Sequence, residues 1–530
     1  MQLYKSLFLF LIVSLTQIGL VVGQTTTPKK NVRQIKVLHS DVGRMAKIDG
    51  ANAFKLIGAV KAEHDGSILL CDSAYLYEEN NSMDAFGHVH IIVNDSLDLF
   101  GDFLYYNGNT KIAEVHDHVS LVDKKTTLYT DELIYDRNTA IGKYYIWGKI
   151  VDSTNVLTSK KGYYYSNIET VFFKDSVVVV NPEYIMKSDT LRYNMHTEVV
   201  YFMGPSTIVG DSSYLYAEDG YYDSKMKEAK LHKNAFVQNK SNTLSGDSIY
   251  YNKFIGVAEA FRNVVMTDTA YDVLITGEYG VYNKKAQYAY VVDSAQAIFL
   301  NKSDSLFIHA DTLMLTLDSV EKPKEIKAFY HMKFFDESIQ GMADSMVYIL
   351  NDSVLKFYQK PFFWFDGNQI SSERIELVSK NGDLDSAVFY DNVFIVSQDT
   401  IDSRYYNQVS GKTMYAWFVD NDLRKIYIKD KAESIYYMWE EDGTPVGMNY
   451  IKSKDILIYL ENQQLETITT INKPTAVLTP LEEVSSAAEK LKNFIWNVDE
   501  RPKKRADIFI KRKSLNKEIE DATVHKTSLR

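Results

Sequence analysis

The sequence has very little cysteine: Cys71 is the only one among 530 residues. A single thiol excludes an intramolecular disulfide framework and a thiolate metal site. Proline is also scarce, with 9 residues, whereas tyrosine (38) and phenylalanine (26) are abundant. Aromatic side chains pack well on a pleated surface, so this balance favours strands. The formal net charge of -11 argues against a nucleic-acid binder, because such proteins are normally basic.

Long apolar runs are confined to the N-terminus. Lys5 precedes an apolar stretch over residues 7–22, and small residues stand just before Gln24. This order predicts a secretory signal peptide over residues 1–23, with a membrane anchor as the alternative. No later segment approaches the roughly 20 apolar residues that span a bilayer. We therefore expect an exported chain that begins with a flexible leader over residues 24–35.

The sequence carries no recognisable catalytic motif. It has no Gly-x-Ser-x-Gly elbow, no His-Glu-x-x-His pair and no P-loop. Carboxylates recur throughout the chain, but an active site needs one constellation that is held once. We therefore expect no enzymatic activity, no catalytic residue, no metal site and no cofactor.

A fixed-period repeat organises most of the chain. An acidic residue is followed two positions later by an aliphatic residue and four positions later by tyrosine, as in Asp247, Ile249 and Tyr251. From Asp72 to Asp247 this key position recurs every 29 or 30 residues. Later spacings are longer. The acidic key positions are Asp72, Asp102, Asp131, Asp189, Glu218, Asp247, Glu278, Asp311, Asp344, Glu373 and Asp455. Such periods indicate stacked repeats that share a continuous core.

Each repeat reads as strands joined by tight Asn, Asp, Lys and Gly turns, which favours antiparallel hairpins. We expect an all-β array of about a dozen units, with regular repeats over residues 36–270 and longer, diverged repeats over residues 271–473. The acidic residue is interpreted as a bend-former. Because strand side chains alternate, the aliphatic and tyrosine positions share one face, while Ser248 and Tyr250 lie on the opposite face. Either face can point inward at this point. The candidate inner-face residues are Leu104, Tyr106, Leu133, Tyr135, Leu191, Tyr193, Ile249 and Tyr251.

Residues 474–530 differ from the repeats. Thr479–Pro480 resembles a helix start, and apolar residues at helical spacing predict a short amphipathic helix over residues 481–496. A basic run over residues 503–513 follows. It is read either as a solubilising tail or as a contact with anionic lipid headgroups.

Two His-x-His pairs occur in successive repeats, at His88 and His90 and at His116 and His118. Neighbouring imidazoles can bind a transition metal. Exposed strand histidines without a metal are the simpler interpretation.

The repeats resemble a known family. The phrases Val37–Leu38–His39–Ser40–Asp41 and Leu70–Cys71–Asp72–Ser73–Ala74–Tyr75–Leu76–Tyr77, and the Gly-Asp-x-Leu-x-Tyr motif that starts at Gly101, are similar to OstA-like proteins of the Bacteroidetes type. These proteins belong to the OstA/LptA/LptC superfamily of lipopolysaccharide transport. The resemblance covers roughly residues 35–470, most securely 36–270.

The resemblance implies an elongated antiparallel β-jellyroll, folded like a taco around an apolar groove. Such proteins act in the periplasm and hold lipopolysaccharide acyl chains away from water during outer-membrane assembly. The implied partners are lipopolysaccharide, LptC-like inner-membrane and LptD-like outer-membrane components, and possible further copies joined edge to edge. The candidate inner-face residues then become candidate groove residues. The chain is far longer than a single LptA module, and it lacks the C-terminal barrel strands of LptD.

Two other functions stay open at this point. One is a secreted structural or adhesive β-solenoid with a closed core and no lipid. The other is a polysaccharide-active enzyme built as a right-handed parallel β-helix.

Overall fold

The computed structural model describes residues 33–511 except 95–96, 125, 212, 240–241, 269–271, 301–304, 321, 382 and 462–463. The predicted signal peptide, most of the predicted leader and the end of the basic tail lie outside the described residues. The chain divides into two compact units. Within the described range, unit 1 comprises residues 33–124 and 130–140, and unit 2 comprises residues 126–129 and 141–511.

Unit 1 consists of antiparallel strands. They are β1 (Lys36–His39), β2 (Val42–Ile48), β3 (Ala51–His64), β4 (Ser67–Tyr77), β5 (Ser82–Asn94), β6 (Leu97–Asn107), β7 (Ile112–Asp123) and residues 130–136 of β8 (Thr126–Asp136).

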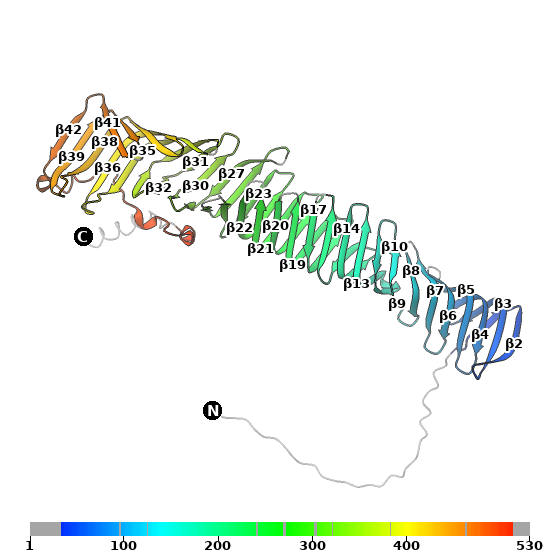
Figure 1. Ribbon diagram of the computed structural model, residues 1–530. Coiled ribbons are helices and arrows are strands. Elements are labelled where there is room, and N and C mark those ends of the chain that lie inside the picture. The colour runs from blue at the N-terminus through cyan, green and yellow to red at the C-terminus, as the bar shows by residue number, and fades with distance from the viewer. Residues whose placement is uncertain are drawn as a thin grey trace, which may run out of the picture. The chain divides into compact units, whose positions relative to one another are not determined.

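Unit 2 continues the same construction, and Figure 1 shows its strands stacked side by side up to β42. Its first strands are β9 (Ile141–Tyr144), β10 (Gly148–Val151), β11 (Val156–Ser159), β12 (Lys161–Tyr165), β13 (Thr170–Asn181), β14 (Tyr184–Asn194), β15 (Val199–Phe202), β16 (Ser206–Gly210), β17 (Ser213–Ala217), β18 (Asp219–Asp223), β19 (Glu228–Asn239), β20 (Asn242–Asn252), β21 (Val257–Asp268) and β22 (Val273–Asn283). A 3-10 turn, η1 (Ser166–Ile168), precedes β13.

The later strands of unit 2 are shorter at first and then long again. They are β23 (Tyr288–Val292), β24 (Gln296–Leu300), β25 (Ser305–His309), β26 (Thr312–Leu317), β27 (Pro323–Phe329), β28 (Lys333–Phe335), β29 (Ile339–Met342), β30 (Ser345–Ile349), β31 (Val354–Tyr358), β32 (Phe362–Phe365), β33 (Asn368–Ser371), β34 (Arg374–Lys380), β35 (Asp383–Gln398), β36 (Tyr406–Val419), β37 (Asp422–Lys429), β38 (Ala432–Trp439), β39 (Pro445–Ser453), β40 (Asp455–Glu461), β41 (Gln464–Ile471) and β42 (Thr475–Thr479).

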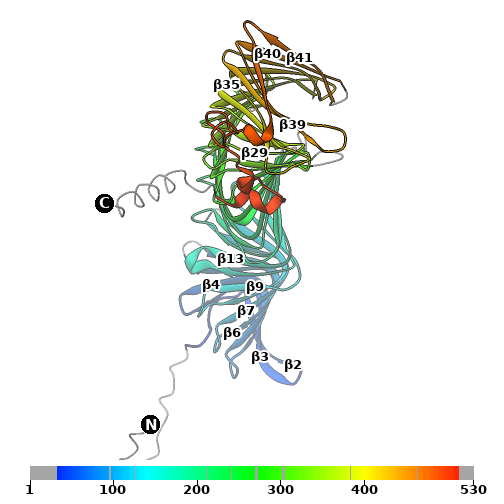
Figure 2. The same ribbon diagram turned by 90° about the vertical axis from the view of Figure 1, so that its left-hand side faces the viewer.

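Each unit has two walls, because the long strands bend at a corner and contribute one half to each wall. In unit 2 the first wall contains β9, β12, β15, β18, β23, β26, β27, β30, β31, β34, β37, β40 and β41. The second wall contains β10, β11, β16, β17, β24, β25, β28, β29, β32, β33, β38, β39 and β42. Strands β13, β14, β19–β22, β35 and β36 pass through both walls. Figure 2 shows β40 and β41 of the first wall spread away from β39 of the second.

The corners are β-bulges. Two residues stay unpaired between the two halves of a ladder, as between Phe100 and Phe103 on β6. On the facing strand, Asp117 and His118 have φ values of 60° and 49°. This left-handed pair turns the chain from one wall into the other, and the acidic key position lies at the same corner. The bend predicted from the repeats is therefore present.

The antiparallel fold predicted from the sequence is confirmed. Every strand pair whose register is described is antiparallel, as between β13 and β14. The interpretation as a right-handed parallel β-helix enzyme is therefore wrong.

The helix predicted over residues 481–496 does not form. The segment from 480 to 511, called here the C-terminal strap, contains only the short 3-10 turns η2 (Leu481–Glu483), η3 (Val498–Glu500) and η4 (Arg505–Phe509). Two of its apolar residues are nevertheless buried, because Leu491 is 7% exposed and Ile508 is 0% exposed. The strap is the red segment of Figure 1.

Candidate functional site

The structure places the eight candidate residues on the inner face of the walls. Leu104, Leu191 and Ile249 are 0% exposed, and Leu133 is 1% exposed. The tyrosines Tyr106, Tyr135 and Tyr193 are buried, while Tyr251 is partly exposed. Of the two registers that the alternation allows, the structure shows the one that turns these residues inward.

These aliphatic residues pack against protein. Leu104 faces Ala85 and Val115 on the neighbouring strands, and all three side chains are 0% exposed. In this conformation they form a closed core, so their contact with a lipid stays a prediction.

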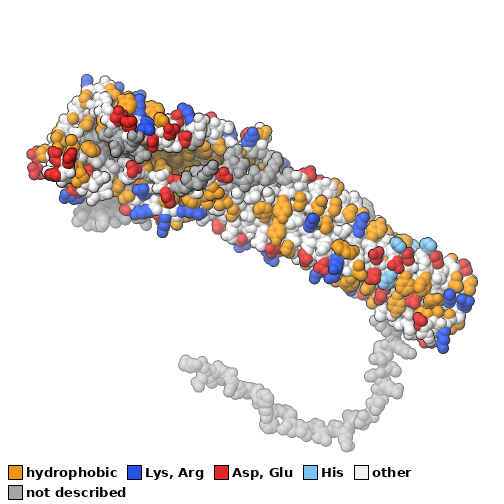
Figure 3. Space-filling view, viewed as in Figure 1, with side chains coloured by type: hydrophobic (Ala, Val, Ile, Leu, Met, Phe, Trp, Pro, Cys, Tyr) orange, Lys and Arg blue, Asp and Glu red, His pale blue; other side chains and the backbone are white. Residues whose placement is uncertain are grey.

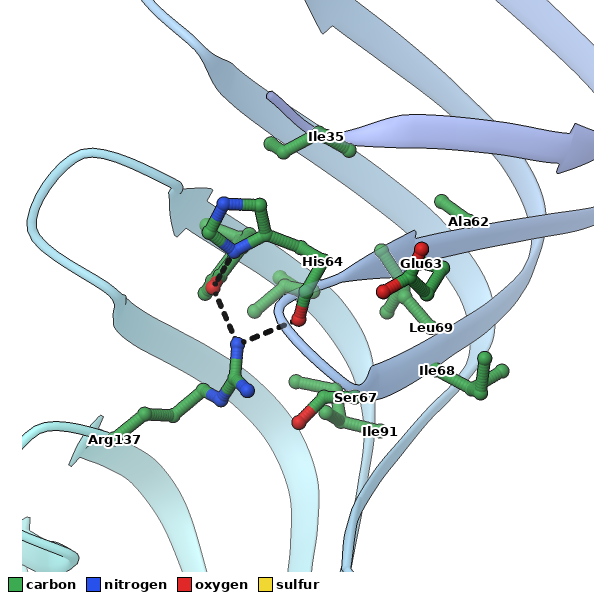
Figure 4. A pocket seen from close by; sticks show the side chains of 11 residues that line it. Ile35, Ala62, Glu63, His64, Ser67, Ile68, Leu69, Ile91 and Arg137 are labelled. Carbon is green, nitrogen blue, oxygen red and sulfur yellow. Dashed lines mark hydrogen bonds between the residues drawn. The ribbon is translucent and has the colours of Figure 1, made fainter. Parts of the chain in front are cut away.

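A polar network closes the rim of unit 1, where Figure 4 shows it beside a small cavity. Arg137 Nη1 donates to the Tyr106 hydroxyl at 2.8 Å, and that hydroxyl lies 2.7 Å from Nδ1 of His64. The other His64 nitrogen, Nε2, lies 2.9 Å from the backbone oxygen of Arg33. The partners assign the proton to Nε2 and leave Nδ1 to accept from tyrosine. Burial raises the pKa of Tyr106, which keeps its hydroxyl protonated.

The cavity beside this network is small. Its volume of ≈ 20 Å³ suits one water molecule and excludes an acyl chain. Asp65, in the turn after β3, pairs with Lys111 and with Arg33, so the two rims of unit 1 are joined by charge as well. The hydrogen bond from Lys111 is the main cause that lowers the pKa of Asp65.

The rims of unit 2 are also joined along its early strands. The turn between β10 and β11 lies on the second wall, and its Asp152 accepts a hydrogen bond from Tyr193 of the first wall at 2.8 Å. Tyr184 and Tyr222 then meet edge to face across the same opening, with ring centroids 5.3 Å apart. Burial is the main cause that raises the pKa of Tyr222 to about 12. The interior of this part of unit 2 is therefore closed.

Further along unit 2 the interior opens into a groove. A core of buried residues still fills the corner between the walls, including Phe334, Phe357 and Ile375. Beside these buried residues, apolar side chains on both walls pack on this core and stay partly exposed. They are Leu355 and Leu377 on the first wall and Leu306, Ile339, Phe365 and Ile395 on the second. We call the surface formed by these six residues the groove.

The space-filling view agrees with this description. Figure 3 shows the surface hollowed near the strands that Figure 1 labels β30 and β31, with hydrophobic side chains at the bottom of the hollow. A facing pair of apolar walls cannot recognise a particular polar group, but it can remove the apolar part of an amphipathic ligand from water.

What covers the outer face of the second wall could not be predicted from the sequence. Ile370 of β33 packs in the core between the walls, so its neighbour Gln369 points outward. Gln369 is 0% exposed because the C-terminal strap covers it. Its Nε2 donates to the Ile495 carbonyl at 2.7 Å, and its Oε1 accepts from the Asn497 amide at 2.7 Å.

Three more buried glutamines hold the strap in the same way. Gln408 donates to the Glu489 carbonyl and accepts from the Leu491 amide. Gln340 accepts from Arg501 at 2.7 Å, and Gln296 accepts from Arg505 at 2.7 Å. The recurrence of a glutamine one residue before an inner-facing position is a pattern that an alignment of the later repeats could have shown.

Aromatic rings and one ion pair complete this contact. Under the strap lie Met342, Phe362 and Trp364, each 5% exposed or less. Phe494 of the strap packs edge to face on Tyr406. Lys333 and Glu500 form a salt bridge at 3.5 Å.

The histidine pairs do not gather around a common centre. His88 bonds to Asp72 and His118 to Asp102, both at 2.7 Å, and His90 bonds to Asp98. Among the residues that the structure describes, no group of three or more His, Cys, Asp or Glu side chains could hold a metal ion. Over the same part of the chain, no helix is both long and apolar enough to cross a membrane.

Comparison with known proteins agrees with the resemblance read from the repeats. The family model for OstA-like proteins matches residues 32–189 and residues 185–247. This part of the chain is OstA-like, and the resemblance is confirmed over it. The groove lies beyond the matched residues, on strands that continue the same two walls. No curated protein matches the chain.

Proposed function

Starting from the OstA-like region of residues 32–247, we propose that this protein binds the acyl chains of lipopolysaccharide in the groove and shields them from water during outer-membrane assembly. One observation carries the proposal: the partly exposed apolar side chains of the two facing walls, such as Leu355 and Phe365. Such surfaces are unfavourable in water unless something apolar covers them.

The dimensions of the groove fit an extended ligand. The second-wall residues of the groove lie within six strands that pair in succession, namely β25, β28, β29, β32, β33 and β35. At about 4.8 Å per strand spacing, these strands span roughly 24 Å. Each methylene buried there contributes about 0.8 kcal/mol. Because the repeats offer similar contacts at each step, a chain can shift along the groove at little net cost.

The location and the partners follow from the same proposal. The protein acts in the periplasm, between LptC-like inner-membrane and LptD-like outer-membrane components, without catalysing a reaction. Among the described residues, β2 pairs on one side only, with β3, and β41 pairs on one side only, with β40. Exposed apolar residues lie on these edge strands, including Met45 (60% exposed) and Ile468 (49% exposed). Strand addition at such edges would join the chain to like modules.

Photo-crosslinking with purified lipopolysaccharide tests the groove. A crosslinking side chain at Leu355 or Leu377 faces the groove, whereas one at Lys356 or Glu376 lies on the outer side of the same strands. We expect capture at the first pair only. Capture at the outer pair alone would place the ligand on the wrong face, and no capture at any position would overturn the proposal.

A secreted structural solenoid is the second candidate, and the closed core around Leu104 favours it over that part of the chain. Depletion of the protein in the producing cell separates the two functions. Increased outer-membrane permeability supports lipid transport, and normal permeability supports the structural function.

A further inference from the structure

The rims of unit 2 are joined at one place by charge. Glu183 lies in the turn between β13 and β14, on the rim of the second wall. Its Oε2 lies 3.1 Å from Nζ of Lys227 and 3.4 Å from Nζ of Lys253, both on the rim of the first wall. The side chain of Lys227 is 25% exposed and that of Lys253 is 60% exposed. One carboxylate thus holds two ammonium groups across the opening.

These lysines belong to a basic rim. Three turns of the first wall follow one another, because the Lys253 amide donates to the Lys227 carbonyl at 2.9 Å and the Lys284 amide donates to the Gly256 carbonyl at 2.8 Å. The turns carry Lys225, Lys227, Lys253, Lys284 and Lys285. Lys225 pairs with Glu198 at 3.4 Å. Lys227 and Lys253 therefore share the single carboxylate of Glu183.

Apolar side chains are exposed on the same turns. Met226 is 56% exposed, Phe254 is 59% exposed and Ile255 is 48% exposed. Ammonium groups beside exposed apolar groups match the boundary between a charged headgroup and its acyl chains.

The basic rim also lies where the interior changes from closed to open. Tyr193 is 2% exposed, whereas its equivalents Tyr222 and Tyr251 in the next two repeats are partly exposed. Leu244 and Met266 of the second wall are partly exposed as well. Met266, Ile275 and Phe299 continue this row of partly exposed apolar side chains along the second wall as far as Leu306 of the groove. A ligand that enters along this row from the closed end therefore meets Lys227 and Lys253 first.

We propose that Lys227 and Lys253 bind the phosphate of a lipid headgroup whose acyl chains lie in the groove, and that the phosphate takes the place of Glu183. This inference rests on the proposed function. A phosphate monoester carries about −1.5 to −2 charges and three acceptor oxygens, so it satisfies two ammonium groups better than one carboxylate. Without the lipid, Glu183 neutralises the pair and keeps the rims together. When the phosphate binds, Glu183 is released and the rims can separate.

Calorimetric titration of the full chain tests the site with three probes: monododecyl phosphate, dodecyl maltoside and inorganic phosphate. The double variant K227Q/K253Q should bind monododecyl phosphate about tenfold more weakly, since it loses two partly exposed charge-assisted bonds. E183Q should bind the same probe more tightly, because it removes the competing carboxylate. Dodecyl maltoside should bind all variants equally. K187Q is the control, because exposed Lys187 lies on the outer side of β14, four residues from Glu183 in the sequence.

Three results would overturn the inference. If monododecyl phosphate binds wild type and all variants equally while dodecyl maltoside also binds, the headgroup site fails and the groove stands. If neither amphiphile binds, the proposed function fails together with the site. If inorganic phosphate binds as tightly as monododecyl phosphate and responds to the same variants, the site takes free phosphate and the lipid assignment is wrong.

Discussion

Nδ1 of His88 lies 2.7 Å from Oδ2 of Asp72, and both residues sit at a corner where strands pass between the walls. His118 bonds to Asp102 in the same geometry at the next corner. Elsewhere asparagine replaces histidine at this position, as in Asn234 with Glu218 and Asn263 with Asp247. The repeated acidic residue thus accepts a bond from a left-handed residue on the following strand.

The corner histidines predict a pH dependence of stability. The hydrogen bond to Asp72 raises the pKa of His88 above its ordinary value of 6.5, and Asp102 does the same for His118. A histidine whose pKa is higher in the folded than in the unfolded protein stabilises the fold while it is protonated. This stabilisation is complete below the pKa of the unfolded state and disappears as the pH rises through the pKa of the folded state. The variant H88N/H118N should therefore lose less stability than wild type as the pH rises above about 6.5.

Thermal unfolding of both proteins at several pH values measures this difference, and NMR titration of the two imidazoles measures the pKa values directly. Asparagine is the matched substitution because it tolerates the left-handed backbone. Parallel curves for wild type and variant would contradict the prediction.

The closed core and the groove should respond differently to truncation. Leu104→Ala leaves a cavity where the side chain was 0% exposed, so we expect a loss of about 2–4 kcal/mol. Leu355→Ala removes a partly exposed side chain and should cost about 1 kcal/mol or less. Hydrogen exchange on β6 and β31 reports each site separately. Equal protection losses at the two sites would show that the groove is packed as tightly as the core.

The glutamines predict how the C-terminal strap is held. Gln369→Leu leaves the buried Trp364 Nε1 and the Asn497 amide without their acceptor, each worth about 1–3 kcal/mol. We expect the Asn497 amide to exchange at least about tenfold faster, while the walls stay folded. Gln398→Leu is the control, because exposed Gln398 ends the neighbouring strand β35 and bonds only to a local carbonyl. Unchanged exchange at Asn497 would show that the glutamine does not hold the strap.

The buried ion pair predicts non-additive effects. The side chains of Lys333 and Glu500 are 4% and 13% exposed, so removal of one partner leaves a poorly solvated charge. Lys333→Met or Glu500→Leu alone should cost about 3 kcal/mol, and the double variant should cost less than the sum of the two. Denaturant unfolding of the four proteins completes the cycle. Additive single effects would exclude direct coupling.

The sharing of one face by the aliphatic and tyrosine positions could be predicted from the sequence, because strand side chains alternate with a period of two. Which of the two faces points inward is shown by the burial of the side chains in the structure. Leu104, Leu191 and Ile249 accordingly point inward. The separation of the walls could not be predicted, since the same row serves both the closed core and the partly exposed groove. That separation depends on rim contacts between distant residues, such as Glu183 and Lys253.

The incorrect prediction of a helix over residues 481–496 has a similar cause. Leu491 has the spacing of an amphipathic helix, but its amide bonds to Gln408, 83 residues earlier in the chain. A backbone amide that donates to a side chain so far away in the sequence is already satisfied without the i−4 carbonyl of a helix. Local spacing carries no information about such a partner.

The C-terminal strap is synthesised after the wall that it covers, and this order affects the nascent chain. Most neighbouring strands in unit 2 are joined by short turns and can pair as soon as they are made, whereas Arg505 reaches Gln296, 209 residues earlier. The second wall therefore emerges with Trp364 and Phe362 exposed to water, and they are covered only when the following segment arrives. Until then a nascent or truncated chain displays an apolar strip that chaperones and proteases can recognise, and docking of the strap removes this signal.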